Sequence, residues 1–346
     1  MAPVAGAMGR LGTCRLRTSP RARHGDLRAL RMRGLTLTWT LFVLVLATPY
    51  IWHARQLERS NLQLAVIRQV GVQERAAQWR LMKNNFGARW EGETRWFKPV
   101  SLTEVSPVSD PLPAIYQLEF PAEASEVGTW RGWGVLKPGD TRTVPLSEAT
   151  VIDRSPGSST FQFEGVGGRC SLRSDGEVWG AEVNFFHGGR RSGLVIYYKN
   201  ATVDSLMSMS FRRAPISHDG NKTFVNTSTM TISSNADPIV ASGNAVGAPL
   251  ISRVGKCGRR TRLNRAYELS SVDSQSTSSD WQNADGQSLL VGLPDRVYSQ
   301  VPLELGGSAR LTFGCDFRDI NGPFRSLTIV FNDSECTEWI CEEYEA

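Results

Sequence analysis

Glu182 and Asp316 stand at matching positions of a repeated stretch, and each is followed nine positions later by an arginine, Arg191 and Arg325 respectively. The first pair lies in Ala181–Gly193 (AEVNFFHGGRRSG), and a similar stretch follows 134 positions later. A charged side chain on an apolar wall orients a ligand that carries a carboxylate or a carbonyl. At a rim exposed to water the same residues would form ordinary ion pairs, worth about 0–1 kcal/mol. Both interpretations stay open.

Aromatic side chains gather in the same part of the chain, and three of them are candidates for ligand contact: Trp90, Trp130 and Tyr197. They can stack on a planar or polyene ligand, or fill a barrel interior as core. A general acid or base role for Glu182 or Asp316 would require burial and a raised pKa.

Motifs for metals and nucleotides are not found. Beyond residue 83 the chain has two histidines, His187 and His218, and no HExxH sequence or Cys/His cluster, so we expect no metal centre. The absence of a P-loop or a glycine-rich dinucleotide fingerprint leaves no support for a nucleotide cofactor. The net charge of +5 comes from eight arginines before residue 34, so it does not indicate nucleic-acid binding.

The elements that must position these residues are short extended runs, which begin near Phe86 and are bounded by Gly, Pro, Ser or Asp. Their β-branched and aromatic content predicts an all-β, antiparallel barrel or sandwich. The repeated stretch predicts two copies of one closed domain, each with its own core. Gly188-Gly189 and Asn321-Gly322 are expected to form hairpin turns.

An even-length turn places Glu182 and Arg191 on one face of the sheet, and likewise Asp316 and Arg325. About four residues of stagger, or about 13 Å of strand, separate the members of each pair.

The N-terminal region has a separate character. Residues 1–33 form a basic leader, and residues 34–52 contain no charge and are long enough to cross a membrane. The arginine excess predicts that the leader stays inside and that the rest crosses. A cleaved signal or transit peptide is the alternative. Residues 53–83 are expected to form an amphipathic helical stalk. The two β domains are predicted over 84–217 and 218–346.

Cysteines and glycosylation motifs give weaker information. Five cysteines follow the apolar segment, and Cys336 and Cys341 are expected on opposite faces of a strand, which disfavours a bond between them. Glycosylation motifs, relevant in a secretory lumen, occur at Asn200, Asn221, Asn226 and Asn332.

Several blocks carry a family resemblance. Asn84–Pro99 (NNFGARWEGETRWFKP) resembles the opening of lipocalin-type barrels, where a glycine and a tryptophan begin the first strand and the tryptophan closes the barrel end. Here two residues separate Gly87 from Trp90. Glu182–Tyr198, Leu293–Phe317 and Phe324–Trp339 are similar to blocks of a lipocalin-like family of unknown function from photosynthetic organisms. The resemblance implies two tandem antiparallel calycin-like barrels and a plastid-related setting, and it supplies no activity.

The sequence thus predicts a membrane-tethered, lipocalin-like protein that binds a hydrophobic small molecule, either a pigment or a lipid. Alternatives are a chromophore-attachment factor or enzyme that uses the barrel pocket, and a scaffold without ligand. The expected location is a plastid membrane, crossed once, or the secretory pathway as a type II membrane protein. The oligomeric state is not predicted.

Overall fold

The computed structural model describes residues 73–122, 125–135, 139–152, 158–171, 179–215, 244–245, 257–272, 287–333 and 335–344. The basic leader, the apolar segment 34–52, the predicted boundary near residue 218 and two glycosylation motifs, Asn221 and Asn226, lie outside these ranges. Within them, no helix has the length and apolar character needed to cross a membrane.

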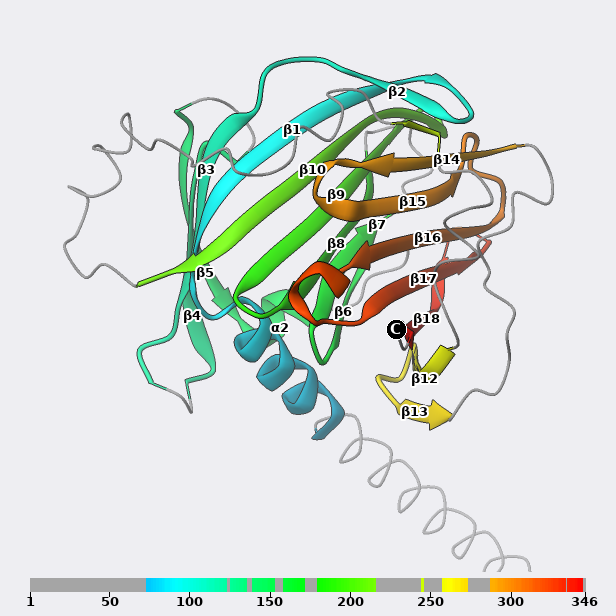
Figure 1. Ribbon diagram of the computed structural model, residues 1–346. Helices are drawn as coiled ribbons and strands as arrows, with labels where there is room; N and C mark the ends of the chain where they lie inside the picture. Colours follow the sequence, from blue (N-terminus) through cyan, green and yellow to red (C-terminus); the bar gives the residue numbers. More distant parts are fainter. Residues whose placement is uncertain are drawn as a thin grey trace, which may run out of the picture. The chain divides into compact units, whose positions relative to one another are not determined.

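The described chain is mainly β, as predicted, and its strands form two antiparallel sheets (Figure 1). The first, sheet A, consists of β1 (Arg89–Ser101), β2 (Glu104–Pro107), β3 (Leu112–Glu119), β4 (Val127–Trp133), β5 (Thr141–Ser147), β6 (Ser158–Phe163), β7 (Val166–Ser171), β8 (Trp179–His187), β9 (Arg190–Lys199) and β10 (Thr202–Ala214).

The second, sheet B, consists of β11 (Asn244–Ala245), β12 (Cys257–Asn264), β13 (Leu269–Val272), β14 (Ser288–Leu293), β15 (Val297–Pro302), β16 (Ser308–Asp316), β17 (Phe324–Asn332) and β18 (Glu335–Tyr344). One short helix, α2 (Glu148–Val151), and two 3-10 turns, η2 (Pro294–Arg296) and η3 (Arg318–Ile320), connect strands.

Both sheets are up-and-down meanders in which an early strand returns to pair with the last one. In sheet A the order is β5-β4-β3-β1-β10-β9-β8-β7-β6, so β1 pairs with β10. In sheet B, β12 pairs with β18. Sheet A curls into a half-barrel whose edge strands are β5 and β6, with α2 between them in the chain (Figure 1).

Two hairpins share the same construction, one in each sheet. Asn200 and Asp333 open their turns with the same left-handed φ of 50°. Just beyond each turn one residue is bulged out of the pairing, Asp204 in β9–β10 and Thr337 in β17–β18. These matching features are 133 positions apart, whereas the sequence repeat has an offset of 134. The structural alignment of the two hairpins therefore differs by one residue from the alignment of the repeated sequence. A shift of one residue moves every side chain of a strand to the opposite face.

The preceding hairpins differ between the sheets. Gly188 and Gly189, with φ of 53° and 77°, form the predicted two-residue turn, and β8 and β9 pair directly around it. In sheet B the connection spans residues 317–323 and contains η3. Because this loop has an odd length, Asp316 pairs with Phe324 while Arg325 pairs with Cys315. The prediction that Asp316 and Arg325 share a face is wrong for this reason.

The two sheets share one hydrophobic core. Buried side chains of β9, such as Leu194 and Ile196, belong to the same cluster as Leu327 and Ile329 of β17. The expectation of a separate core for each copy is therefore wrong for the described residues. Polar contacts also join the sheets: the Tyr198 hydroxyl donates to the Pro302 carbonyl at 3.0 Å.

A helix over the described residues 73–86 packs against sheet A. Gln78 donates to the Gln162 carbonyl at 3.0 Å and accepts from the Gln162 amide at 2.7 Å. Asn85 donates to the Phe163 carbonyl at 2.8 Å, and Trp79 is buried. The predicted helix is thus observed where it is described, and in these residues it belongs to the folded unit.

The described cysteines are all buried. Cys336 pairs with Phe331 and Cys341 with Leu327, which places both cysteines on the same face of β18. The bulge at Thr337 reverses the alternation on which the opposite-face prediction relied. The Cys336 sulfur lies 3.5 Å from that of Cys170, on β7 of sheet A.

Candidate functional site

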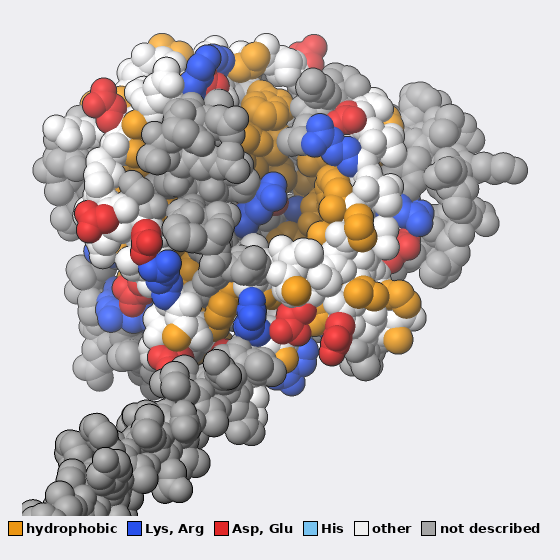
Figure 2. Space-filling model, turned by 180° about the vertical axis from the view of Figure 1, so that it is seen from behind, with side chains coloured by type: hydrophobic (Ala, Val, Ile, Leu, Met, Phe, Trp, Pro, Cys, Tyr) orange, Lys and Arg blue, Asp and Glu red, His pale blue; other side chains and the backbone are white. Residues whose placement is uncertain are grey.

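A cavity of about 450 Å³ lies inside the half-barrel of sheet A. Side chains from strands β3 to β10, from α2 and from the helix at 73–86 line it. Figure 2 shows a hollow in this face of the molecule, with hydrophobic side chains inside it and Lys or Arg side chains beside it. The volume is within the range of small-molecule sites, about 300–1,000 Å³.

Strand alternation decides which side chains reach this cavity. On β9, Arg191, Val195 and Tyr197 line it, while Leu194 and Ile196 belong to the core shared with sheet B. Every second residue of a strand points to the same face, so one strand serves both the cavity and the core.

Glycine allows the sheet to curl tightly around the cavity. A Cβ atom at Gly180 of β8 would lie 1.5 Å from the carbonyl oxygen of Ile196 on β9. At Gly92 of β1 it would lie 1.8 Å from the Ser210 carbonyl oxygen on β10. Only glycine permits such close approach of neighbouring backbones.

Arg191 is the most unusual residue of the cavity wall. Its side chain is fully buried, and its Nε donates to Asn184 Oδ1 at 2.9 Å. The guanidinium carbon lies 3.8 Å from the centroid of the Tyr116 ring and 5.1 Å from those of Phe86 and Phe211. Among the described residues, neither Nη1 nor Nη2 has a hydrogen-bond acceptor. An aromatic cage thus holds the cation without satisfying its terminal donors.

The electrostatics follow from this burial. Burial lowers the pKa of Arg191, and the neighbouring Tyr116 and Glu182 oppose that shift. Burial also raises the pKa of Tyr116 to about 12 and that of Tyr197 to about 12. Both tyrosines therefore stay protonated at neutral pH and can act as donors.

Glu182 is the carboxylate of the cavity wall, and it lies between two arginines. Its oxygens are 3.3 Å from Arg169 Nε and 3.9 Å from Arg191 Nη2. The longer distance is an ion pair without a hydrogen bond. The nine-residue spacing in the sequence therefore brings Glu182 and Arg191 onto one wall, as the turn geometry predicted.

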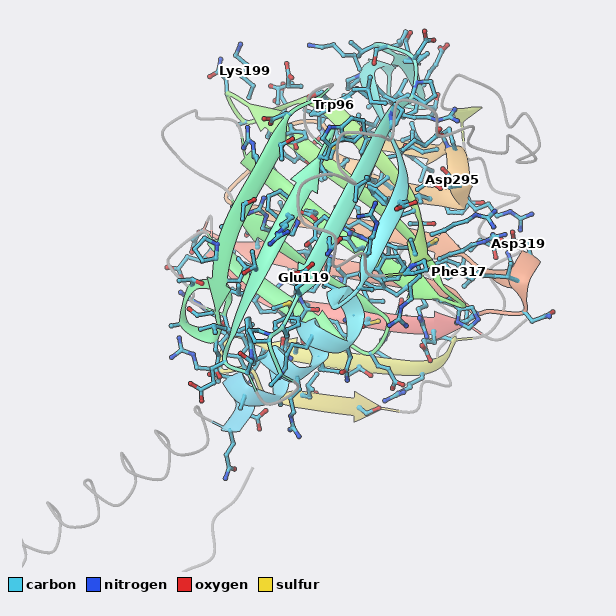
Figure 3. All side chains as sticks on the ribbon, turned by 90° about the vertical axis from the view of Figure 1, so that its left-hand side faces the viewer. Trp96, Glu119, Lys199, Asp295, Phe317 and Asp319 are labelled. Atoms are coloured by element: carbon cyan, nitrogen blue, oxygen red, sulfur yellow. The ribbon has the colours of Figure 1, made fainter. Side chains whose placement is uncertain are left out.

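Four of the predicted ligand-contact residues line this one cavity: Glu182, Arg191, Trp130 and Tyr197. Trp130 stacks edge-on to Tyr116 at 5.5 Å, and its Nε1 is buried without an acceptor among the described residues. Tyr197 stacks on Trp96 at 5.3 Å with an interplanar angle of 19°. Figure 3 shows Trp96 and Glu119 toward opposite ends of the strands of sheet A.

Trp90, Asp316 and Arg325 have other surroundings. Trp90 is buried, donates from Nε1 to the Phe86 carbonyl at 3.3 Å and lies 5.5 Å from the Phe186 ring. In sheet B, Asp316 accepts from Arg318 Nε at 2.8 Å, and Arg325 bonds Glu343 at 2.7 Å. These three residues are absent from the cavity wall.

Sequence reasoning missed Tyr116, Asn184 and the pair Met207 and Met209, which also belong to the cavity or to the Arg191 cage. Alternation within IYQLEF would have placed Tyr116 and Leu118 together on one face. Nothing local in the sequence indicated that this face was the inner one.

The described glycosylation motifs are at exposed positions. Asn200 and Asn332 are both exposed. Asn200 lies in the turn between β9 and β10, and Asn332 is the last residue of β17, next to the turn of the matching hairpin.

Comparison with known proteins gives a likeness of fold. Neither a protein-family model nor any curated protein matches the chain. Among solved structures, a protein of unknown function from the DUF3598 family of Nostoc punctiforme is similar, with a TM-score of 0.52 and 15% identity. The match covers 78% of this chain and 99% of that one. The described part of the chain therefore resembles, in its fold, a cyanobacterial protein whose function is unknown.

Proposed function

We propose that the half-barrel of sheet A binds a hydrophobic small molecule, a pigment or a lipid. The observation that carries this proposal is the cavity of about 450 Å³, which has mainly apolar and aromatic walls and one fully buried cation. Ligand sites typically combine such walls with a few polar groups that fix orientation. A half-barrel that served as scaffold alone would be expected to fill this space with side chains.

The walls suit an extended or planar apolar ligand. Leu118, Val195 and Met207 supply aliphatic surface, and Tyr116 and Trp130 supply ring faces and edges. Methionine adapts its shape to a ligand because it is unbranched and flexible. A lipid chain and a polyene pigment both fit this chemistry.

The wider setting belongs to the same proposal. We infer that the sheets derive from two tandem calycin-like barrels, which the shared meander order and the matching hairpins support. The uncharged segment 34–52 would tether the protein to a membrane, in a plastid by the family resemblance. A tethered protein is well placed to exchange a membrane-soluble ligand.

A pair of matched valine substitutions tests the proposal. Val195 lines the cavity, and Val100 is 61% exposed on β1. The full-length chain is titrated with a fatty acid, a carotenoid and a tetrapyrrole, and binding is followed by quenching of tryptophan fluorescence. We expect binding of at least one class, weakened about tenfold or more by Val195→Trp and unchanged by Val100→Trp.

Thermal unfolding checks that both variants fold. Failure of all three classes to bind the wild-type chain would leave the scaffold interpretation. Equal binding by the two folded variants would place the ligand outside this cavity.

A further inference from the structure

Among the described residues, the terminal nitrogens of Arg191 have the Glu182 carboxylate at 3.9 Å and Tyr116 as polar neighbours, but no acceptor in good hydrogen-bond geometry. Both Nη atoms are buried without an acceptor among the described residues, although the side chain lines the cavity. A buried charged donor without a partner is costly to leave, and native structures rarely keep one without a reason. The acceptor is expected to come from the cavity.

We propose that the ligand of the half-barrel carries one carboxylate, which accepts hydrogen bonds from both Nη groups of Arg191. This inference rests on the proposed function and names the class of ligand: an amphiphile with an apolar body and a single anionic head, of the fatty-acid kind. The planar fork of a guanidinium matches a carboxylate with two parallel hydrogen bonds.

The orientation of Arg191 is fixed before the ligand arrives. Asn184 holds Nε at 2.9 Å, and the Tyr116 ring covers the guanidinium carbon at 3.8 Å. These contacts fix the side chain and leave its two buried Nη groups as the donors without an acceptor among the described residues. Such preorganisation reduces the entropy lost on binding.

The nearby charges favour a monoanion over a phosphate. Glu182 lies 3.9 Å from Arg191 Nη2, outside hydrogen-bond distance, so its negative charge is next to the proposed head group. A divalent phosphate would be repelled by this carboxylate more strongly than a single carboxylate would. Trp130 Nε1, a second buried donor of the wall without an acceptor among the described residues, accommodates a ligand oxygen without adding charge.

The rings around Arg191 set where the head group of the proposed ligand would lie. Phe86, Phe211 and Tyr116 surround the guanidinium, which places the carboxylate at the aromatic end of the cavity. The apolar body then lies along Leu118, Leu146 and Val195.

The test compares palmitate with its neutral analogue methyl palmitate, on the full-length chain, by equilibrium dialysis. We expect palmitate to bind about tenfold or more tightly than the ester, because the ester cannot accept a charge-assisted pair of hydrogen bonds. In Arg191→Met this ratio should fall to about one. Arg212→Met, at an exposed arginine of β10, should keep the ratio of the wild type.

Arg191→Lys serves as a second variant if Arg191→Met does not fold. It keeps the positive charge but removes the planar guanidinium and its two parallel hydrogen bonds. Its ratio should lie between those of the wild type and of the methionine variant. Palmitate should also raise the melting temperature of the wild type more than that of either variant.

The outcomes separate the two proposals. Equal binding of acid and ester to the wild type, or an unchanged ratio in the folded Arg191 variants, overturns the carboxylate inference and leaves hydrophobic binding intact. If neither the acid, the ester nor any apolar probe binds, the proposed function itself fails.

Discussion

The guanidinium carbon of Arg191 lies 3.8 Å from the centre of the Tyr116 ring, so a buried cation is stacked on an aromatic face inside the half-barrel. A desolvated contact of this kind contributes about 2 kcal/mol. It explains how the fold tolerates a cation whose Nη atoms lack acceptors among the described residues.

Substitutions at Tyr116 measure this contact. Tyr116→Leu should lower the free energy of unfolding by about 2 kcal/mol or more, because it removes the ring from the cation. Tyr116→Phe keeps the ring and loses only the hydroxyl, so it should cost about 1 kcal/mol or less. Urea denaturation of the two variants gives the comparison, and equal losses would mean that the ring does not stabilise Arg191.

Arg325 joins the two sheets. Its Nη1 donates to the Phe186 carbonyl of β8 at 2.7 Å, and its Nε bonds Glu343 at 2.7 Å. Arg325→Ala should destabilise the protein by about 1–3 kcal/mol, because it leaves a carbonyl at the contact without its charged donor. Arg265→Ala, which removes an exposed ion pair with Glu335, is the control and should cost less than about 1 kcal/mol. If the two variants lose similar amounts of unfolding free energy in chemical denaturation, the role of Arg325 in joining the sheets is contradicted.

An ion pair between the two sheets lies at the surface. Arg190 Nη1 bonds Asp319 at 2.7 Å, between the end of the β8–β9 hairpin and the loop that contains η3. Figure 3 shows Asp319, Phe317 and Asp295 at the right-hand edge of the molecule. Because both side chains are partly exposed, this pair is expected to contribute little.

The turn between β9 and β10 stores strain that glycine would relieve. Ala201 has a left-handed φ of 62° and is exposed. Ala201→Gly should therefore stabilise the protein by up to about 1 kcal/mol, and Ala201→Val should destabilise it by more than that. Shifts of melting temperature in opposite directions are the expected result. Destabilisation by both substitutions would show that the alanine side chain makes a contact of its own.

The comparison of the two hairpin regions shows what the sequence could predict. Glu182 and Arg191 lie on one wall because Gly188-Gly189 forms a two-residue turn. The two glycines predict that turn from the sequence alone. Asp316 and Arg325 separate because Asn321-Gly322 is part of a longer, odd-length loop. The sequence similarity of the two stretches hid this difference, since a constant offset cannot show where a loop is extended.

One sequence pattern is consistent with the shared core. Residues 193–198 of β9 (GLVIYY) are apolar at consecutive positions, a pattern typical of strands covered on both faces. Tertiary packing assigns one face to the cavity and the other to sheet B. The cage around Arg191 could not be predicted, because Phe86, Tyr116 and Phe211 come from three distant elements.

Asp316 should make stability depend on pH in the acid range. Burial alone would raise the pKa of this carboxyl, but hydrogen bonds and the charge of Arg318 outweigh burial and lower it below its ordinary value of 3.8. The folded state therefore binds the proton less tightly than the unfolded state does. The resulting stabilisation is present above about pH 4 and is lost as pH falls through the lowered pKa.

Asp316→Asn should reduce the loss of stability between about pH 4 and pH 2. Asp110→Asn, at an exposed position, should leave the slope as in the wild type. The slopes come from urea denaturation at a series of pH values. An unchanged slope in Asp316→Asn would contradict the role of the pair with Arg318.

Methyl NMR of methionine tests ligand binding in the half-barrel most directly. Met82, Met207 and Met209 line the cavity, and the chain has seven methionines in all. In the full-length chain labelled with 13C at its methionine methyl groups, palmitate should shift the signals of these three residues, assigned by Met→Leu substitution. Absence of any shift at these three, up to the solubility limit of palmitate and of apolar probes, would contradict binding in this cavity.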